Sequence, residues 1–236
     1  MNIFKTKLGT ENLEMREKWL KKILRSIPKG SSIIDVGAGE LGYKQYCRHL
    51  EYTSQDFCQY DGSGNSEGLQ TGEFDTSKID IVSDITEIPV EAESFDAVMC
   101  IEVLEHVPDP VRAIEEMSRI LKSGGFMIIT APFCSLTHFA PYHFSTGFNK
   151  YFYKKYLEDR GFDIKEITPN GNWYAYIAQE LRRLPYMSLK YSNKKMGFMN
   201  KLLIKYFVNV LDKLNSVDHG SSELLTYGYD VLAIKK

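Results

Sequence analysis

Apolar residues follow two different spacings along this chain, and the spacing predicts its secondary structure. Short runs rich in Ile, Val and Phe are typical of buried strands, whereas apolar positions three or four residues apart are typical of helices with one buried face. These patterns predict strands at 32–36, 51–57, 78–85, 95–103, 126–130, 162–168 and 224–234, and helices at 11–27, 40–50, 110–122, 149–160, 172–184 and 198–216. Asp109 is placed to cap the helix that Pro110 begins, and Ser123-Gly124-Gly125 ends it.

Strands that alternate with helices predict an α/β fold, a Rossmann-like three-layer sandwich with a mostly parallel sheet. In such sheets, ligands bind beyond the carboxyl ends of the strands. Asp35, Asp56, Asp84 and Glu102 lie at the ends of predicted strands, so we expect them to converge on one crevice. The loop at 133–148, rich in histidine and aromatic residues, follows a further strand and is expected to overhang the same crevice.

The stretch at 32–42 has the pattern of a buried strand that breaks into a glycine turn and opens a helix. Gly37, Gly39 and Gly42 satisfy the G-x-G-x-x-G spacing of dinucleotide-binding turns, so the glycines alone leave a nicotinamide cofactor open. A carboxylate at Asp35 would repel a pyrophosphate and attract the sulfonium and ammonium groups of S-adenosylmethionine. Asp35 also fits a structural role, in which it caps the amides of the turn.

The composition limits the classes of protein that need to be considered. With 236 residues and a net charge of −2, the chain is long enough for one α/β domain with an added segment, and its charge does not point to nucleic acid. Its four cysteines form no C-x-x-C pair, which is typical of reduced thiols in a cytosolic protein. Neither a signal peptide nor a membrane span is evident, so we expect a cytoplasmic location.

We predict a single domain over residues 1–236. A leader helix is expected within 1–30, the cofactor-binding core within 31–168, a helical insertion or lid within 169–222, and the final strand within 223–236. This division places the candidate chemistry in the core and leaves the insertion to be explained.

The insertion combines an apolar stripe with a basic zone. Apolar residues recur at helical spacing over Met199–Leu214, and residues 181–211 contain seven Lys or Arg and no Asp or Glu. Core or lid packing explains the stripe, and a solvated face explains the charges. Core or lid packing is the preferred interpretation, and a peripheral contact between residues 181–214 and an anionic membrane is the alternative that combines both features.

Five motifs occur in order between residues 31 and 167. They are Asp35-Val36-Gly37-Ala38-Gly39, then Asp56, then Asp84-Ile85 with Ile88-Pro89, then Phe95-Asp96-Ala97-Val98 leading to Glu102-Val103-Leu104-Glu105-His106-Val107-Pro108-Asp109-Pro110, and last Arg119-Ile120-Leu121-Lys122-Ser123-Gly124-Gly125. In this order and spacing they resemble the class I S-adenosylmethionine-dependent methyltransferases, in particular the small-molecule (type 11/23-like) group. The resemblance implies a seven-stranded sheet with an antiparallel last strand, and S-adenosylmethionine as the cofactor.

The resemblance also implies a set of cofactor contacts. These are Asp35, Gly37, Ala38, Gly39, Asp56, Phe57, Asp84, Ile85, Ile101 and Glu102. Asp35 would lie near the ammonium group, and the glycine turn would let the methionine part lie against the backbone. Asp56 would hold the ribose hydroxyls, and Phe57 would stack on the adenine.

The remaining implied contacts concern the adenine amino group and the sulfonium. Asp84 would accept a hydrogen bond from the amino group with Ile85 beside it, and Ile101 and Glu102 would line the floor beneath the sulfonium. Phe57, Ile85 and Ile101 are equally compatible with plain core packing.

A hydroxyl acceptor must lose a proton on methylation, and histidine is the side chain suited to accept it at neutral pH. His106 and His143 are the predicted catalytic residues, with His143 preferred over His138. His106 alternatively only shapes the pocket.

A metal-assisted mechanism is a further alternative. If the chain is helical after the fourth strand, Glu102, Glu105 and His106 share one face, and His143 could be a fourth ligand. The cluster resembles that of metal-assisted methyltransferases acting on vicinal hydroxyls, in which Mg²⁺ polarises the acceptor oxygen. The metal-free mechanism is preferred.

The sequence therefore predicts an enzyme that transfers a methyl group from S-adenosylmethionine to an oxygen or nitrogen of a small acceptor. A sugar or surface-polysaccharide precursor is the expected acceptor class, no nucleic-acid partner is expected, and the oligomeric state is open. Two other classes of protein remain as alternatives. One is a nicotinamide-dependent oxidoreductase, and the other is a non-catalytic module that binds S-adenosylmethionine.

Overall fold

The structure, a computed structural model, describes residues 6–236, so the first part of the predicted leader segment lies outside the described residues. The elements in chain order are α1 (Asn12–Ser26), β1 (Ser32–Val36), the 3₁₀ turn Lys44–Tyr46, β2 (Glu51–Asp56), β3 (Ile81–Val82), β4 (Phe95–Ile101), the 3₁₀ turn Leu104–His106, α2 (Pro110–Ile120), β5 (Leu121–Pro132), α3 (Lys150–Glu158), β6 (Phe162–Asn170), α4 (Trp173–Ser192), α5 (Phe198–Asn215), the 3₁₀ turn Ser221–Glu223 and β7 (Gly228–Lys235). Asp109 caps α2 as predicted, since its Oδ1 accepts a hydrogen bond from the amide of Arg112 at 3.0 Å.

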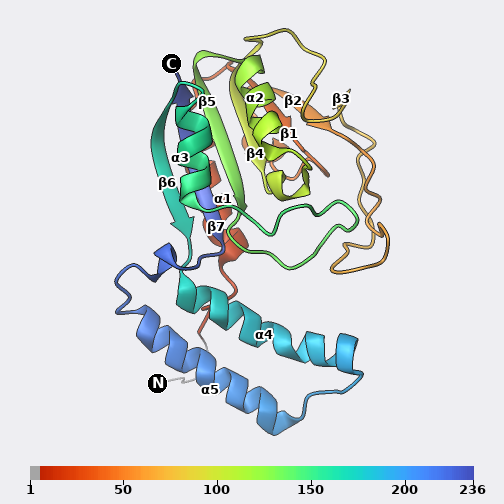
Figure 1. The fold of residues 1–236 in the computed structure, drawn as a ribbon, viewed down its shortest axis with the longest axis vertical. Coiled ribbons are helices and arrows are strands. Elements are labelled where there is room, and N and C mark those ends of the chain that lie inside the picture. The colour runs from red at the N-terminus through yellow and green to blue at the C-terminus, as the bar shows by residue number, and fades with distance from the viewer. Residues whose placement is uncertain (1–5) are drawn as a thin grey trace. The chain divides into compact units, whose positions relative to one another are not determined.

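Seven strands form one sheet in the order β3-β2-β1-β4-β5-β7-β6 (Figure 1). The pairs β1–β2, β1–β4, β2–β3 and β4–β5 are parallel, whereas β7 runs antiparallel to β5. The predicted α/β fold with an antiparallel last strand is therefore confirmed. Because β1 lies between β2 and β4, the carboxyl ends of these three strands meet at the same edge of the sheet.

Alternate residues of the strands face two separate apolar layers. On one face, Ile34 and Val98 belong to a buried cluster with Ile114 and Met117 of α2. On the other face, the neighbouring residue Ile33 belongs to a cluster with residues 19–24 of α1. This alternation is the period of two that a strand requires, and helices cover the strands on both faces.

The predicted helix at 40–50 is wrong. This segment contains turns and a single 3₁₀ turn, and Leu41 has a φ of 61°, which a continuous α-helix does not allow. The predicted strand at 78–85 is reduced to Ile81–Val82, and α4 continues through Pro185 to Ser192 instead of ending at residue 184. The glycine turn therefore opens into a loop and not into a helix.

The described chain divides into two compact units. One unit comprises Lys18–Thr168 with Gly228–Lys236 and contains the central strands, and the other comprises residues up to Glu17 with Pro169–Tyr227 and contains α4 and α5. The single-domain organisation and the lid role of residues 169–222 stay predictions. Within residues 6–236, none of the helices combines the length and the apolar character that a membrane span requires.

Candidate cofactor and acceptor site

In the turn after β1, the backbone of two glycines lies close to the side chains of other residues. Gly37 and Gly39 have φ values of 74° and 50°, in the left-handed region that favours glycine. A Cβ on Gly37 would lie 2.5 Å from a methyl carbon of Val103, and a Cβ on Gly39 would lie 2.8 Å from the ring of Phe74. Both positions therefore require glycine on conformational and on steric grounds.

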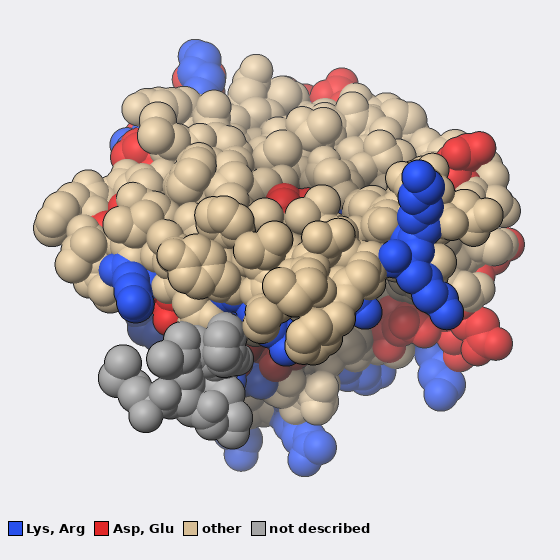
Figure 2. Space-filling model, turned by 90° about the horizontal axis from the view of Figure 1, so that it is seen from below, with Lys and Arg blue, Asp and Glu red and all other residues tan. Residues whose placement is uncertain are grey.

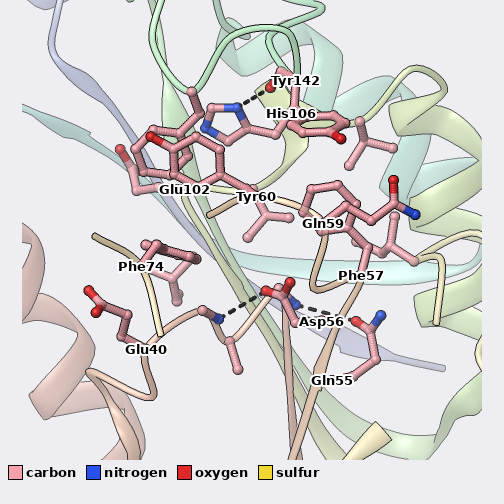
Figure 3. A pocket seen from close by; sticks show the side chains of 18 of the residues that line it. Glu40, Gln55, Asp56, Phe57, Gln59, Tyr60, Phe74, Glu102, His106 and Tyr142 are labelled. Carbon is pink, nitrogen blue, oxygen red and sulfur yellow. Dashed lines mark hydrogen bonds between the residues drawn. The ribbon is translucent and has the colours of Figure 1, made fainter. Parts of the chain in front are cut away.

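Asp56, the last residue of β2, is held rigidly beside this turn. Its Oδ2 accepts a hydrogen bond from the amide of Gly39 (Figure 3), and its Oδ1 accepts one from the amide of Cys58, both at 2.9 Å. Each carboxylate oxygen keeps capacity for a further hydrogen bond. The carboxylate of Asp56 is therefore oriented to accept hydrogen bonds from a diol such as that of a ribose.

A cavity of about 550 Å³ extends along these groups, a volume within the range of small-molecule sites. Ten of the predicted site residues line it: Gly37, Ala38, Gly39, Asp56, Phe57, Asp84, Ile85, Ile101, Glu102 and His106. Asp35 and His143 are not among its lining residues. The predicted convergence at the ends of β1, β2 and β4 is thus present, with these two exceptions.

Asp35 lies inside the protein next to the turn. It is 1% exposed, and its Oδ2 accepts a hydrogen bond from the hydroxyl of Tyr52 at 2.7 Å. Burial, with a smaller contribution from the charge of Asp56, raises the pKa of Asp35 to about 7, against the opposing effect of the Tyr52 hydrogen bond. The contact of Asp35 with a cofactor ammonium group stays a prediction.

Glu102 stands at the end of β4 in an unusual backbone conformation. Its φ is 57°, which is uncommon for a residue with a side chain, and such strain concentrates at functional sites. The hydroxyl of Thr130 donates a hydrogen bond to Oε1 of Glu102, and the amide of Glu102 donates one to the carbonyl of Thr130, both at 2.8 Å. The carboxylate is therefore oriented by the adjacent strand β5.

Two aromatic residues that were not predicted to line the site, Tyr60 and Phe74, join Phe139 of the predicted overhanging loop in the cavity wall. The ring of Phe139 stacks on that of Tyr60, with 4.4 Å between centroids, and Phe74 packs edge-on against both. Tyr60 and Phe74 lie between the predicted strands 51–57 and 78–85, where no helix or strand is predicted. The density of aromatic residues in 133–148 was an available signal, whereas residues 57–80 are no richer in them than the whole chain, and the pairing of the two segments depends on tertiary contacts.

One ring nitrogen of His106, Nδ1, forms a hydrogen bond with the backbone. Its Nδ1 lies 2.5 Å from the carbonyl oxygen of Tyr142 (Figure 3), and because a carbonyl only accepts hydrogen bonds, Nδ1 carries the proton. Burial, followed by the neighbouring His138, lowers the pKa of His106 to about 3. The ring is thus neutral, with its lone pair on Nε2.

A second histidine converges with His106 on Glu105. The Nε2 atoms of His106 and His138 lie 3.8 and 3.9 Å from Oε1 of Glu105, and Nδ1 of His138 donates to the carbonyl of Leu136 at 2.8 Å. One potential ligand atom from each of Glu105, His106 and His138 lies within 4.8 Å of the others. This cluster differs from the predicted set, because His138 takes the place of Glu102, whose carboxylate bonds to Thr130.

His143 lies at the edge of this cluster. Its ring centroid is 4.9 Å from that of His138, and its Nε2 is 3.1 Å from the hydroxyl of Ser135. The catalytic role of His143 stays a prediction.

Comparison with known proteins agrees with this geometry. Residues 34–129 match the family model described as a methyltransferase domain. The ubiquinone biosynthesis O-methyltransferase of Alkalilimnicola ehrlichii is 34% identical over 110 residues, which cover 43% of this chain and 42% of that protein. The demethylmenaquinone methyltransferase of a Mycobacterium species is 31% identical over 109 residues, covering 44% of this chain and 42% of that protein.

Among solved structures, an S-adenosylmethionine-dependent methyltransferase from Archaeoglobus fulgidus aligns with a TM-score of 0.57 and 15% identity, over 95% of this chain and 94% of that one. Residues 34–129 thus match a methyltransferase domain, and the fold is that of the class I S-adenosylmethionine-dependent methyltransferases, whose cofactor is S-adenosylmethionine. The matched part spans less than half the length of the two curated relatives. The nicotinamide-dependent alternative receives no support from these matches.

Proposed function

We propose that this protein transfers a methyl group from S-adenosylmethionine to an oxygen or nitrogen of a small acceptor that carries a planar ring. The observation that carries the proposal is one cavity with two chemically different ends. Gly37–Gly39 and Asp56 provide bare backbone and an oriented carboxylate at one end, and His106, Phe139 and Tyr142 form an aromatic wall at the other.

The residues of this chain would act mainly by alignment. S-adenosylmethionine supplies a methyl group already activated by its sulfonium, so catalysis depends on holding the acceptor in line with that methyl group. Glu102, oriented by Thr130, and the ring of Phe139 restrict the positions that an acceptor can take. The neutral ring of His106 offers Nε2 as a hydrogen-bond acceptor for the acceptor hydroxyl.

A planar ring is favoured over a sugar because of the cavity wall. Phe57, Tyr60, Phe74, Phe139 and Tyr142 all line the cavity, and aromatic side chains bind ring faces by stacking. Two of the relatives are named for ubiquinone biosynthesis and for demethylmenaquinone. A sugar or surface-polysaccharide precursor is retained as the alternative acceptor class.

The proposal is tested by calorimetric titration with S-adenosylmethionine, followed by transfer of a labelled methyl group to separate pools of phenolic compounds and nucleotide-sugars. We expect saturable cofactor binding and label in the phenolic pool. Label only in nucleotide-sugars would overturn the acceptor class. Cofactor binding without transfer to either pool would favour the non-catalytic module.

A second candidate mechanism, metal-assisted O-methylation, is favoured by the Glu105, His106 and His138 cluster. Carbonyl oxygens hold the Nδ1 proton of both histidines, and this fixes the Nε2 lone pairs toward Oε1 of Glu105, an arrangement typical of metal-binding histidines. Two imidazoles and one carboxylate suit Mn²⁺ or Zn²⁺ better than Mg²⁺, which prefers oxygen ligands. A bound ion would lower the pKa of an acceptor hydroxyl.

The metal-assisted mechanism predicts saturable binding of Mn²⁺ or Zn²⁺ that is lost in Glu105→Gln and in His138→Ala. Glu102→Gln is the matched control, because Glu102 lies near the cluster but bonds to Thr130. Methyl transfer that continues unchanged in excess EDTA, together with identical metal titrations for all four proteins, would overturn this mechanism and leave the metal-free one.

A further inference from the structure

The helices α4 and α5 pack on each other through one side only of α5. Val208 is buried, and Ile204 and Leu211 are partly buried against the cluster that includes Ala175 and Ala178 of α4. The spacing of 204, 208 and 211 is that of a single helical stripe. This stripe accounts for the apolar packing between the two helices.

A second apolar stripe of α5 is left exposed. Met199, Leu203, Tyr206, Phe207 and Leu214 recur at helical spacing and are between 45% and 65% exposed. Twelve of the 17 large apolar side chains that are exposed in residues 6–236 lie between Leu184 and Leu224. Figure 2, turned by 90° from the view of Figure 1, shows a broad area with few charged side chains, with Lys and Arg as well as Asp and Glu side chains at its edge. An exposed apolar surface of this extent is typical of an interaction site.

The charges of the same segment have one sign. Residues 181–211 carry seven Lys or Arg and no Asp or Glu, although the whole chain has 29 Lys and Arg against 31 Asp and Glu. Lys194 and Lys195 are exposed in the segment between the helices, and Lys201 and Lys205 are exposed on α5. The positive charge is therefore local to the segment that carries the apolar surface.

We infer that the α4–α5 surface binds a lipid bilayer that contains anionic headgroups. An apolar stripe with Tyr and Phe, together with the Lys and Arg residues of the acid-free range 181–211, is the combination that holds a helix in the interface of an anionic membrane. A second copy of this chain fits the charge less well, because two such surfaces would bring like charges together. The inference concerns residues 169–227 alone and does not depend on the proposed methyl transfer.

The test is flotation of the full chain with vesicles at low salt. We expect the protein to float with vesicles that contain phosphatidylglycerol, to remain unbound with phosphatidylcholine alone, and to be released by salt. The double variant Tyr206→Ser/Phe207→Ser should abolish flotation. Lys194→Gln/Lys195→Gln should weaken it by roughly an order of magnitude or more, since each lysine near an anionic surface contributes about fivefold.

Tyr151→Ser is the matched control, because Tyr151 is an equally exposed helical tyrosine in α3. It should float like the wild-type protein. Circular dichroism and thermal unfolding establish that each variant is folded. Failure of the wild-type protein to float with anionic vesicles overturns the inference. Flotation of Tyr206→Ser/Phe207→Ser to the same extent as the wild-type protein also overturns it. The same holds if the wild-type protein does not bind vesicles and light scattering shows a wild-type dimer that these substitutions abolish.

Discussion

The hydroxyl of Tyr52 in β2 donates a hydrogen bond to the carboxyl group of Asp35 in β1, with 2.7 Å between the two oxygens. The pair is formed across adjacent parallel strands, directly before the glycine turn. Burial raises the pKa of Asp35 to about 7 despite this hydrogen bond. An acid that titrates near neutral pH therefore lies next to the cofactor turn.

We expect Asp35→Asn to remove a pH dependence of stability. Asp35 titrates near 3.8 when unfolded and near 7 when folded, so the folded state binds the proton more tightly. Its contribution to stability is complete below the unfolded pKa and is lost as pH rises through the folded pKa. The free energy of unfolding of Asp35→Asn, relative to wild type, should rise across this window by an amount on the order of 4 kcal/mol.

Urea unfolding of both proteins across this pH range measures the difference. Tyr52→Phe removes the hydrogen bond that lowers the pKa of Asp35, so in this variant the loss of stability should extend to higher pH and be larger in total than in the wild-type protein. The prediction would be contradicted if the free energies of unfolding of Asp35→Asn and of the wild-type protein differed by the same amount at every pH.

Asp56→Asn should weaken cofactor binding. Both carboxylate oxygens of Asp56 accept hydrogen bonds from backbone amides, so an asparagine would place its amino group opposite Gly39 or Cys58. Hydrogen bonds to charged groups are worth about 1.5–3 kcal/mol, and we expect the dissociation constant for S-adenosylhomocysteine to rise by one to two orders of magnitude. Calorimetry measures the constant, and Asp163→Asn, an exposed aspartate of β6, should leave it unchanged.

Gly37→Ala should abolish cofactor binding. The new Cβ would combine a φ of 74° with a 2.5 Å approach to Val103. Gly30→Ala is the matched control, since Gly30 has a φ of 81° and open space around its Cβ position. Gly30→Ala should lose about 1 kcal/mol of stability and keep its affinity for the cofactor. Equal loss of affinity in both variants would show that the contact with Val103 is unimportant.

Arg119→Lys should destabilise the segment that follows Asp84. The guanidinium of Arg119 donates to the carbonyls of Ile88 and Val90 at 3.0 and 2.9 Å, while Glu116 accepts from the amide of Ile88 at 2.8 Å. A lysine cannot reproduce this planar arrangement, and we expect a loss of about 2 kcal/mol in the free energy of unfolding. Arg112→Lys, in an exposed ion pair at 3.8 Å, should have no measurable effect in the same urea titration.

Much of the fold follows from local pattern. The two-residue period of the strands determined which side chains face each helical layer, and Asp109 with Pro110 marked the start of α2. The glycine turn and Asp56 at the end of β2 could be predicted from the sequence for the same reason, because a parallel sheet brings successive strand ends to one edge. The sequence by itself therefore determined the class of fold and ten of the residues that line the cavity.

Only the tertiary structure decided the acceptor half and the position of Asp35. The amides of Phe144 and Ser145 both donate to the carbonyl of Glu105, and this attachment brings His138 and Phe139 to the cavity edge. Asp35 follows the strand pattern of its neighbours, yet its partner Tyr52 comes from another strand and holds it inside the protein. Spacing along the chain encodes contacts within an element or between successive strand ends. Contacts between irregular loops leave no periodic pattern in the sequence, so they can be identified only in the folded structure.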